Sequence, residues 1–131
     1  MKVTTRQFRN DILQNGGATY DPTTGEYNPT EGYMVSYIGT EVKRPQEIFI
    51  TQDVRDFYKR FGSKIEEEGN YIGGWIEKGE VYLDVSTKIM DLYDAVRFAI
   101  ENDQDAIWDA KRGEEIKRHE YEEILKGEYN G

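Results

Sequence analysis

The sequence predicts an α+β domain with a mostly antiparallel sheet in a split βαβ order, and three observations predict it. Residues 71–86 alternate apolar and other side chains with a period of two on both sides of Lys78-Gly79, as in a β-hairpin with two unlike faces. Residues 51–65 and 91–102 repeat apolar side chains at steps of three and four, as in helices with one buried face. Over residues 33–109 the order is therefore strand, helix, strand, strand, helix, strand, with both helices on one face.

A short amphipathic helix is expected before this core. Thr4 or Thr5 can cap its start, and Phe8 and Ile12 lie on one side of it. The Asn-Gly-Gly run at 15–17 is a strong stop signal. We expect this helix to be peripheral to the sheet.

Residues 18–30 are predicted to form a mobile hairpin or loop, because Pro22 and Gly25 impose turns there. The segment contributes Tyr20 and Tyr27. Tyrosine is favoured at protein interfaces because it buries a large area at little cost in rotamer entropy. Tyr20 and Tyr27 are therefore candidate partner-binding residues.

Residues 33–38 are a dense strand candidate that Gly39 closes. The stretch at 42–45 is irregular, and the apolar run at 48–50 is expected to be an edge strand or a connection. Thr51 then caps the first central helix, which Gly62 weakens in its last turns.

In the hairpin, Lys78-Gly79 occupies the turn, where positive φ must be tolerated. The Ile, Val and Leu side chains share one face, which must be the core face. The opposite face carries Trp75, Tyr82, Asp84 and Glu77. If no helix covers that face, these residues form an exposed aromatic patch with acidic neighbours, which is a plausible binding surface.

The second central helix begins after Asp91, which is a good N-cap, and residues 106–109 are predicted to form the last strand. Residues 113–131 are highly charged, with a few apolar side chains at helical spacing. We expect a peripheral helix there that frays toward Gly131. The chain is then a single domain, 1–131, with an ordered core at about 18–112.

Composition and charge exclude or disfavour several classes of function. The chain has no cysteine, no run long enough for a membrane span and no apolar signal region, which predicts a soluble, cytoplasmic protein without disulfides or thiolate metal sites. Its formal charge is −9, from 26 acidic and 17 basic residues. Direct binding to nucleic acid is therefore disfavoured. The charge either serves solubility or attracts a basic partner.

The residues offer little for catalysis. His119 is the sole histidine and lies in the charged C-terminal segment, and the chain has no nucleophile elbow, phosphate loop or dinucleotide fingerprint. Asp84 and Asp109, with Asp105 or Asp91, are weak candidates for a divalent-cation site because hard cations prefer several oxygen ligands. We expect no catalytic residue and no cofactor.

Four motifs carry a family resemblance: Gly32-Tyr33-Met34-Val35, Gly73-Gly74-Trp75-Ile76-Glu77-x-Gly79-x-Val81-Tyr82-Leu83-Asp84-Val85-Ser86, Ala106-Ile107-Trp108-Asp109 and Gly113-Glu114-Glu115-Ile116. Over about residues 20–116 the chain resembles small uncharacterised proteins of bacteriophages and integrated mobile elements. These motifs are mostly strand and turn positions, so the resemblance implies a setting and no activity. That setting is a phage or prophage accessory protein in a bacterial cytoplasm.

Three hypotheses about function follow. In the first, a non-enzymatic protein binds and inhibits a basic host protein, such as a CRISPR-type defence nuclease, by acidic mimicry of nucleic acid. In the second, the chain is a structural or regulatory module that docks onto another phage protein. In the third, the chain is a metal-dependent enzyme that uses the carboxylates at 84, 91, 105 and 109. The oligomeric state is left open.

Overall fold

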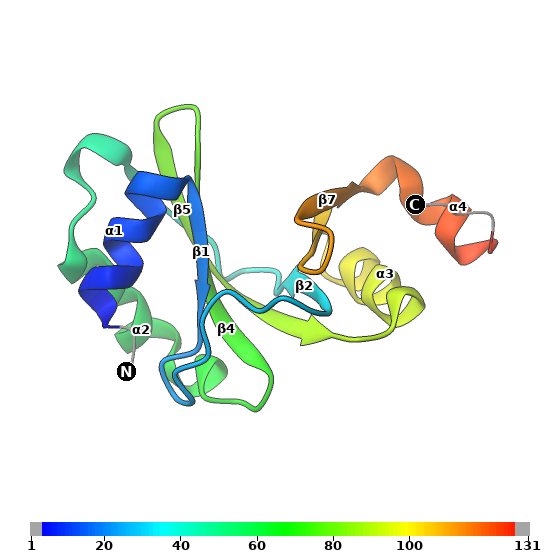
Figure 1. Cartoon of the computed structure of the whole chain (residues 1–131), viewed down its shortest axis with the longest axis horizontal. Helices are drawn as coiled ribbons and strands as arrows, with labels where there is room; N and C mark the ends of the chain where they lie inside the picture. Colours follow the sequence, from blue (N-terminus) through cyan, green and yellow to red (C-terminus); the bar gives the residue numbers. More distant parts are fainter. Residues whose placement is uncertain (1–3, 128–131) are drawn as a thin grey trace.

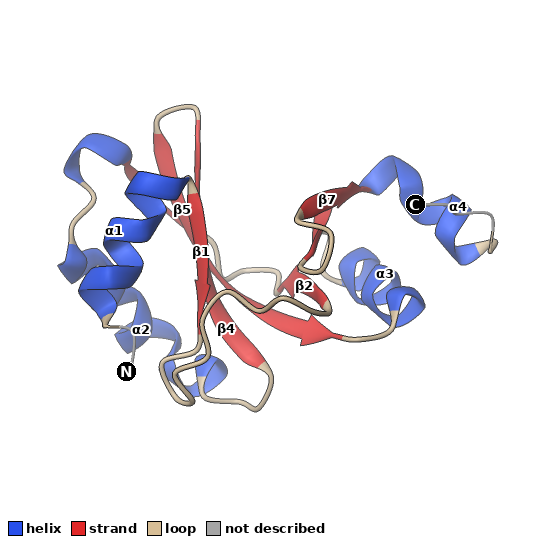
Figure 2. Ribbon diagram, in the orientation of Figure 1, coloured by secondary structure: helices blue, strands red, loops and turns tan. Residues whose placement is uncertain are grey.

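The computed structural model describes residues 4–127 as an α+β fold in which a curled antiparallel sheet carries helices at both of its ends (Figures 1 and 2). The described α-helices are α1 (Thr5–Asn15), α2 (Thr51–Ile65), α3 (Leu92–Glu101) and α4 (Tyr121–Leu125). The described strands are β1 (Gly17–Tyr20), β2 (Tyr33–Ser36), β3 (Val42–Pro45), β4 (Asn70–Glu77), β5 (Glu80–Ile89), β6 (Ala106–Asp109) and β7 (Glu114–Lys117). Short 3-10 helices occupy Gln46–Ile48 and Arg118–Glu120.

The sheet is organised around β5. Its strand order is β1-β4-β5-β2-β6-β7, and β3 also pairs with β5. β4 follows one edge of β5 along its length, whereas β3 and β2 share the other edge one after the other. The central order β4-β5-β2-β6 is antiparallel throughout, so the predicted split βαβ arrangement is confirmed.

The β4–β5 hairpin forms as the sequence predicts. Glu77 pairs with Glu80, which leaves Lys78 and Gly79 as a two-residue turn, and both adopt positive φ, 50° and 79°. Positive φ at both central residues is the geometry of a type I′ turn, whose twist suits the strands on either side of it. Strand β5 continues to Ile89, beyond the predicted end of the hairpin.

The described helices all pack on one face of the sheet. Leu83 and its alternate neighbours on β5 face α1 and α2, whereas Ile89, at the far end of the same face, packs with α3. Because the sheet curls, the two helix pairs lie apart, and each covers its own hydrophobic core (Figure 2). The buried members of the first core are Phe8, Ile12, Ala18, Tyr20, Phe49, Val54, Phe57, Ile65, Ile72, Val81, Leu83 and Val85. Those of the second are Val35, Ala95, Val96, Ala99, Ile107, Ile116, Tyr121 and Ile124.

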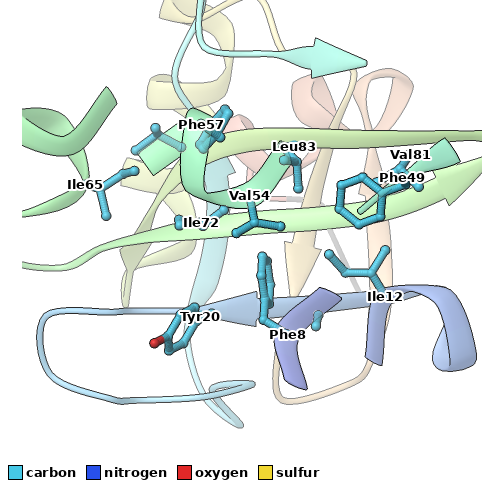
Figure 3. Packing of buried hydrophobic residues seen from close by; sticks show 12 residues of the cluster. Phe8, Ile12, Tyr20, Phe49, Val54, Phe57, Ile65, Ile72, Val81 and Leu83 are labelled. Atoms are coloured by element: carbon cyan, nitrogen blue, oxygen red, sulfur yellow. The ribbon is translucent and has the colours of Figure 1, made fainter. Parts of the chain in front are cut away.

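Helix α1 is less peripheral than the sequence predicts. Thr4 and Gln7 close a capping box at its start. Phe8 and Ile12 are 0% exposed, and Figure 3 shows Phe8 pointing toward the α2 side of the core. A Cβ on Gly74 would lie 2.4 Å from Ile12 Cδ1, so glycine in β4 is what lets α1 pack this closely. The core therefore extends beyond the predicted limits of residues 18–112.

The C-terminal segment corrects the sequence-based expectation of a helix from residue 114. Residues 114–117 form β7, in which Ile116 pairs with Ile107 and is buried in the second core. Tyr121 and Ile124 of α4 cover the same core, and the Tyr121 hydroxyl donates a hydrogen bond to the Gln104 carbonyl. The expected fraying toward residue 131 falls partly on residues 128–131, outside the described range.

Two smaller expectations also change. Helix α2 continues past Gly62 to Ile65, with a non-helical φ of −113° at Phe61. Of the two alternatives for the run at 48–50, the connection is found: Ile48 ends a 3-10 turn, and Phe49 enters the first core before α2 begins. No helix within residues 4–127 combines the length and apolarity that a membrane crossing requires.

Tyr37 joins the two cores. Its ring packs against the first core and meets Phe98 of α3 edge-on at 5.1 Å between centroids. Its hydroxyl donates a hydrogen bond to Asn70, and Lys64 Nζ lies 4.1 Å from its ring centroid. This side chain therefore ties α2, β4 and α3 together.

Candidate functional site

The face of the sheet opposite the helices, called here the helix-free face, carries the residues at even positions of β5 and their cross-strand neighbours. The odd positions of β5 enter the two cores, so strand alternation turns the even ones away from every described helix. Because the sheet curls with its helices outside, the two ends of the helix-free face turn toward one another (Figure 1).

One cross-strand row on this face is aromatic. It runs Lys43, Tyr82, Trp75, Gly17 over β3, β5, β4 and β1. The Trp75 and Tyr82 rings stack with centroids 5.4 Å apart and an interplanar angle of 8°, and Lys43 Nζ lies 5.6 Å from the Tyr82 centroid. Both rings are partly exposed. The row thus presents a flat aromatic stack that has a cation at one end and no side chain at the other.

Two carboxylates stand beside this row. Glu77 and Glu80 face each other directly at the end of the hairpin, and neither forms an ion pair with a basic residue in the described part of the chain. Like charges opposite each other repel. The pKa of Lys117 is raised mainly by its hydrogen bond and ion pair with Glu115 and further by the charge of Glu77.

Asp84 lies on the same face but is only 4% exposed. Ser36 Oγ donates a hydrogen bond to its carboxylate, and a Cβ on Gly73 would come within 2.7 Å of its Oδ1. Burial raises the pKa of Asp84 to about 7, the Ser36 bond lowers it, and Glu41 raises it. Glycine and serine beneath the carboxyl leave room for it at the inner side of the curl.

A loop crosses the other end of the helix-free face. The Tyr71 hydroxyl donates a hydrogen bond to Glu26, and Lys88 Nζ lies 3.3 Å from the same carboxylate. Burial, followed by this bond, raises the pKa of Tyr71. A shallow, open hollow of about 560 Å³ lies at this junction, lined by Asp21, Thr24, Gly25, Glu26, Glu68, Gly69, Tyr71 and Lys88.

Four of the six predicted partner-binding residues share the helix-free face. Trp75, Tyr82, Glu77 and Asp84 lie together, although Asp84 is buried. Tyr20 and Tyr27 do not belong to this surface. Tyr20 is 7% exposed and packs in the first core, and Tyr27 meets it edge-on while donating a hydrogen bond to Asp11. Their aromatic side chains close the core beside α1.

The predicted metal carboxylates do not form one site. Asp84 pairs with Gly73 on the helix-free face, whereas Asp109 pairs with Tyr33 on the helix-covered face and accepts hydrogen bonds from the backbone of residues 111 and 112. Asp91 caps α3, and Asp105 pairs with Arg118. Within residues 4–127 no three His, Asp or Glu side chains are grouped to hold a metal ion.

Sequence reasoning missed three residues of the surface. Lys43 lies in a stretch that looked irregular, Gly17 was interpreted only as a helix stop, and Ser36 showed no signal of its own. Each acquires its position by pairing with a strand far away in the sequence. A local pattern carries no information about such a neighbour.

Comparison with known proteins returns no match to this chain among protein-family models, curated proteins or solved structures. The helix-free face is therefore the observation from which function can be inferred.

Proposed function

We propose that this protein is a non-enzymatic binding protein that docks onto a basic partner protein through its helix-free face. The observation that carries the proposal is the stacked Trp75–Tyr82 pair, which lies partly exposed on a sheet face that no described helix covers. Aromatic side chains at the centre of a surface are the residues that most often supply binding energy in protein interfaces.

Charge supports a basic partner. The chain has a formal charge of −9, and Glu77 and Glu80 stand next to the stack without a direct ion pair among residues 4–127. An acidic protein draws a basic one by long-range attraction, which raises the rate of association, and a complementary charge beside an aromatic anchor adds specificity.

The partner that we propose is a host nucleic-acid-handling protein such as a CRISPR-type nuclease. Its nucleic-acid groove is basic, so an acidic protein seated there would inhibit it by excluding DNA or RNA. The small size of the chain suits such an inhibitor. We propose further that it is a phage or mobile-element protein, as its resemblance implies, and that it meets its partner in a bacterial cytoplasm.

The test is direct binding to purified nucleases of this type, each in its nucleic-acid-free and its guide-loaded form. We expect binding that weakens as salt rises from 50 to 300 mM and that competes with target DNA. Trp75→Ala should weaken it at least tenfold, since truncating a central aromatic costs more than 1.4 kcal/mol. Tyr93→Ala removes an exposed tyrosine from α3, away from this face, and serves as the matched control.

Two results would contradict the proposal. One is failure of every basic partner to bind. The other is binding that Trp75→Ala and Tyr93→Ala weaken equally. Binding that depends on Trp75 but not on salt would contradict a basic partner. It would favour the alternative in which this face docks onto a phage protein.

A further inference from the structure

We infer that the outer face of the Trp75 ring, over Gly17, receives an arginine side chain of the partner. This inference rests on the proposed function, because it names the chemistry that the helix-free face recognises. It follows from the order of side chains in the aromatic row.

The row is capped at one end only. The Tyr82 ring has Trp75 on one side and the Lys43 ammonium on the other, 5.6 Å from its centroid. The Trp75 ring has Tyr82 on one side, and its neighbour on the other side is Gly17, which has no side chain. A Cβ built on Gly17 would lie 3.7 Å from Trp75 Cβ, so any larger residue there would run alongside the indole. Gly17 therefore places no side chain over that side of the stack, and Trp75 is partly exposed.

A cation fits the open end better than a neutral group. Indole is the strongest cation–π partner among the aromatic side chains, and Lys43 already occupies the equivalent position at the other end of the stack. Glu77 follows Trp75 by two residues on the same face of β4, within reach of a group that lies over the indole. A cation in this position is attracted both by the indole ring and by the Glu77 carboxylate.

Arginine fits better than lysine. The guanidinium is planar and stacks on an aromatic face, while its edge can donate two parallel hydrogen bonds to a carboxylate. The facing pair Glu77 and Glu80 supplies carboxylates at the end of the hairpin. The same carboxylates repel phosphate, which disfavours a nucleotide stacked in this position.

The test uses Trp108→Phe as the background, because the chain contains two tryptophans and Trp75 is then the only fluorescent indole. The probe is a triarginine peptide. Tricitrulline is its neutral analogue of nearly the same shape, and trilysine has the same charge without the planar group. We expect triarginine to change Trp75 fluorescence to saturation, trilysine to bind several-fold more weakly and tricitrulline not to bind. Affinity for triarginine should fall as salt rises.

Two variants locate the site. Glu77→Gln should weaken triarginine binding by about three- to tenfold, as expected for loss of a charge-assisted hydrogen bond. Glu101→Gln, the matched control on an exposed position of α3 away from the helix-free face, removes the same charge and should leave binding unchanged. Melting curves of both variants show whether they fold.

Equal responses to triarginine and tricitrulline would overturn the inference, as would a Glu77→Gln variant that binds triarginine like its parent. Its failure is distinguishable from failure of the proposed function. If triarginine does not bind but a basic partner still requires Trp75, the proposed docking face is supported and the proposed arginine site on Trp75 is wrong. If no partner requires Trp75, both are wrong.

Discussion

Replacing Asp84 by Asn should make the protein more stable at neutral pH. Asp84 is buried in the middle of β5, and burial raises the pKa of its carboxyl from 3.8 to about 7 in spite of the opposing Ser36 bond. Between these two pKa values the folded state holds a proton that the unfolded state has lost. Stability is therefore highest below pH 4 as far as this group is concerned, and it falls as pH rises toward 7.

The size of the effect follows from the pKa values. One pKa unit corresponds to about 1.4 kcal/mol, so a pKa of about 7 in place of 3.8 costs the folded state about 4 kcal/mol once Asp84 is ionised. Asparagine has nearly the same shape and cannot ionise. The free energy of unfolding of Asp84→Asn minus that of the parent should be near zero at pH 4 and should rise by about 1.4 kcal/mol per pH unit before levelling off above pH 7.

The assay is urea unfolding of both proteins at half-unit steps from pH 4.5 to 8.5, followed by circular dichroism. Other carboxyls titrate alike in the two proteins, so the difference between them isolates Asp84. Ser36→Ala is the companion variant: it removes the hydrogen bond that lowers the pKa of Asp84, so the levelling-off should move to higher pH. A difference that stays constant across the whole range would refute the reasoning, because Asp84 would then ionise equally in the folded and unfolded states.

Three further predictions concern the architecture. Gly73→Ala should destabilise the fold by about 1–3 kcal/mol, measured by urea unfolding, because the new Cβ would lie 2.7 Å from Asp84 Oδ1 and displace it; an unchanged midpoint would show that the carboxyl has room to move. Tyr71→Phe removes the bond to Glu26 and should cost about 1–3 kcal/mol, with faster amide hydrogen exchange confined to residues 21–27; uniform exchange would contradict a local role for that bond. Tyr37→Ala should separate the unfolding of the two cores, visible as transitions that no longer coincide by fluorescence and circular dichroism; coincident transitions would show that the cores stay coupled without it.

Local patterns predicted the central part of the fold. The period-two alternation on both sides of Lys78-Gly79 predicted the hairpin and its turn, and the structure confirms them. Asp91 as the cap of α3 is confirmed in the same way, since its side chain accepts a hydrogen bond from the Asp94 amide. These features depend on residues a few positions apart, so a short stretch of sequence contains their cause.

Long-range pairing explains where the structure differs from the sequence-based expectations. Ile116 begins a helical spacing of apolar side chains that continues to Leu125, yet residues 114–117 form β7, in which Ile116 pairs with Ile107 of β6 and is buried. Tyr20, predicted to bind a partner, lies in the core because β1 pairs with β4 and α1 covers it. In each case the deciding contact joins segments that no local period connects.

The sequence by itself determined which side chains share a face of the hairpin, because alternation along a strand is a local property of the backbone. It could place Trp75, Tyr82 and Asp84 opposite the core, but not say which of them reaches solvent. Tertiary structure decided that: the curl of the sheet buries Asp84 and raises its pKa, while Trp75 and Tyr82 remain partly exposed in a row between Lys43 and Gly17. Exposure depends on how distant strands and helices pack, and that is a property of the whole fold.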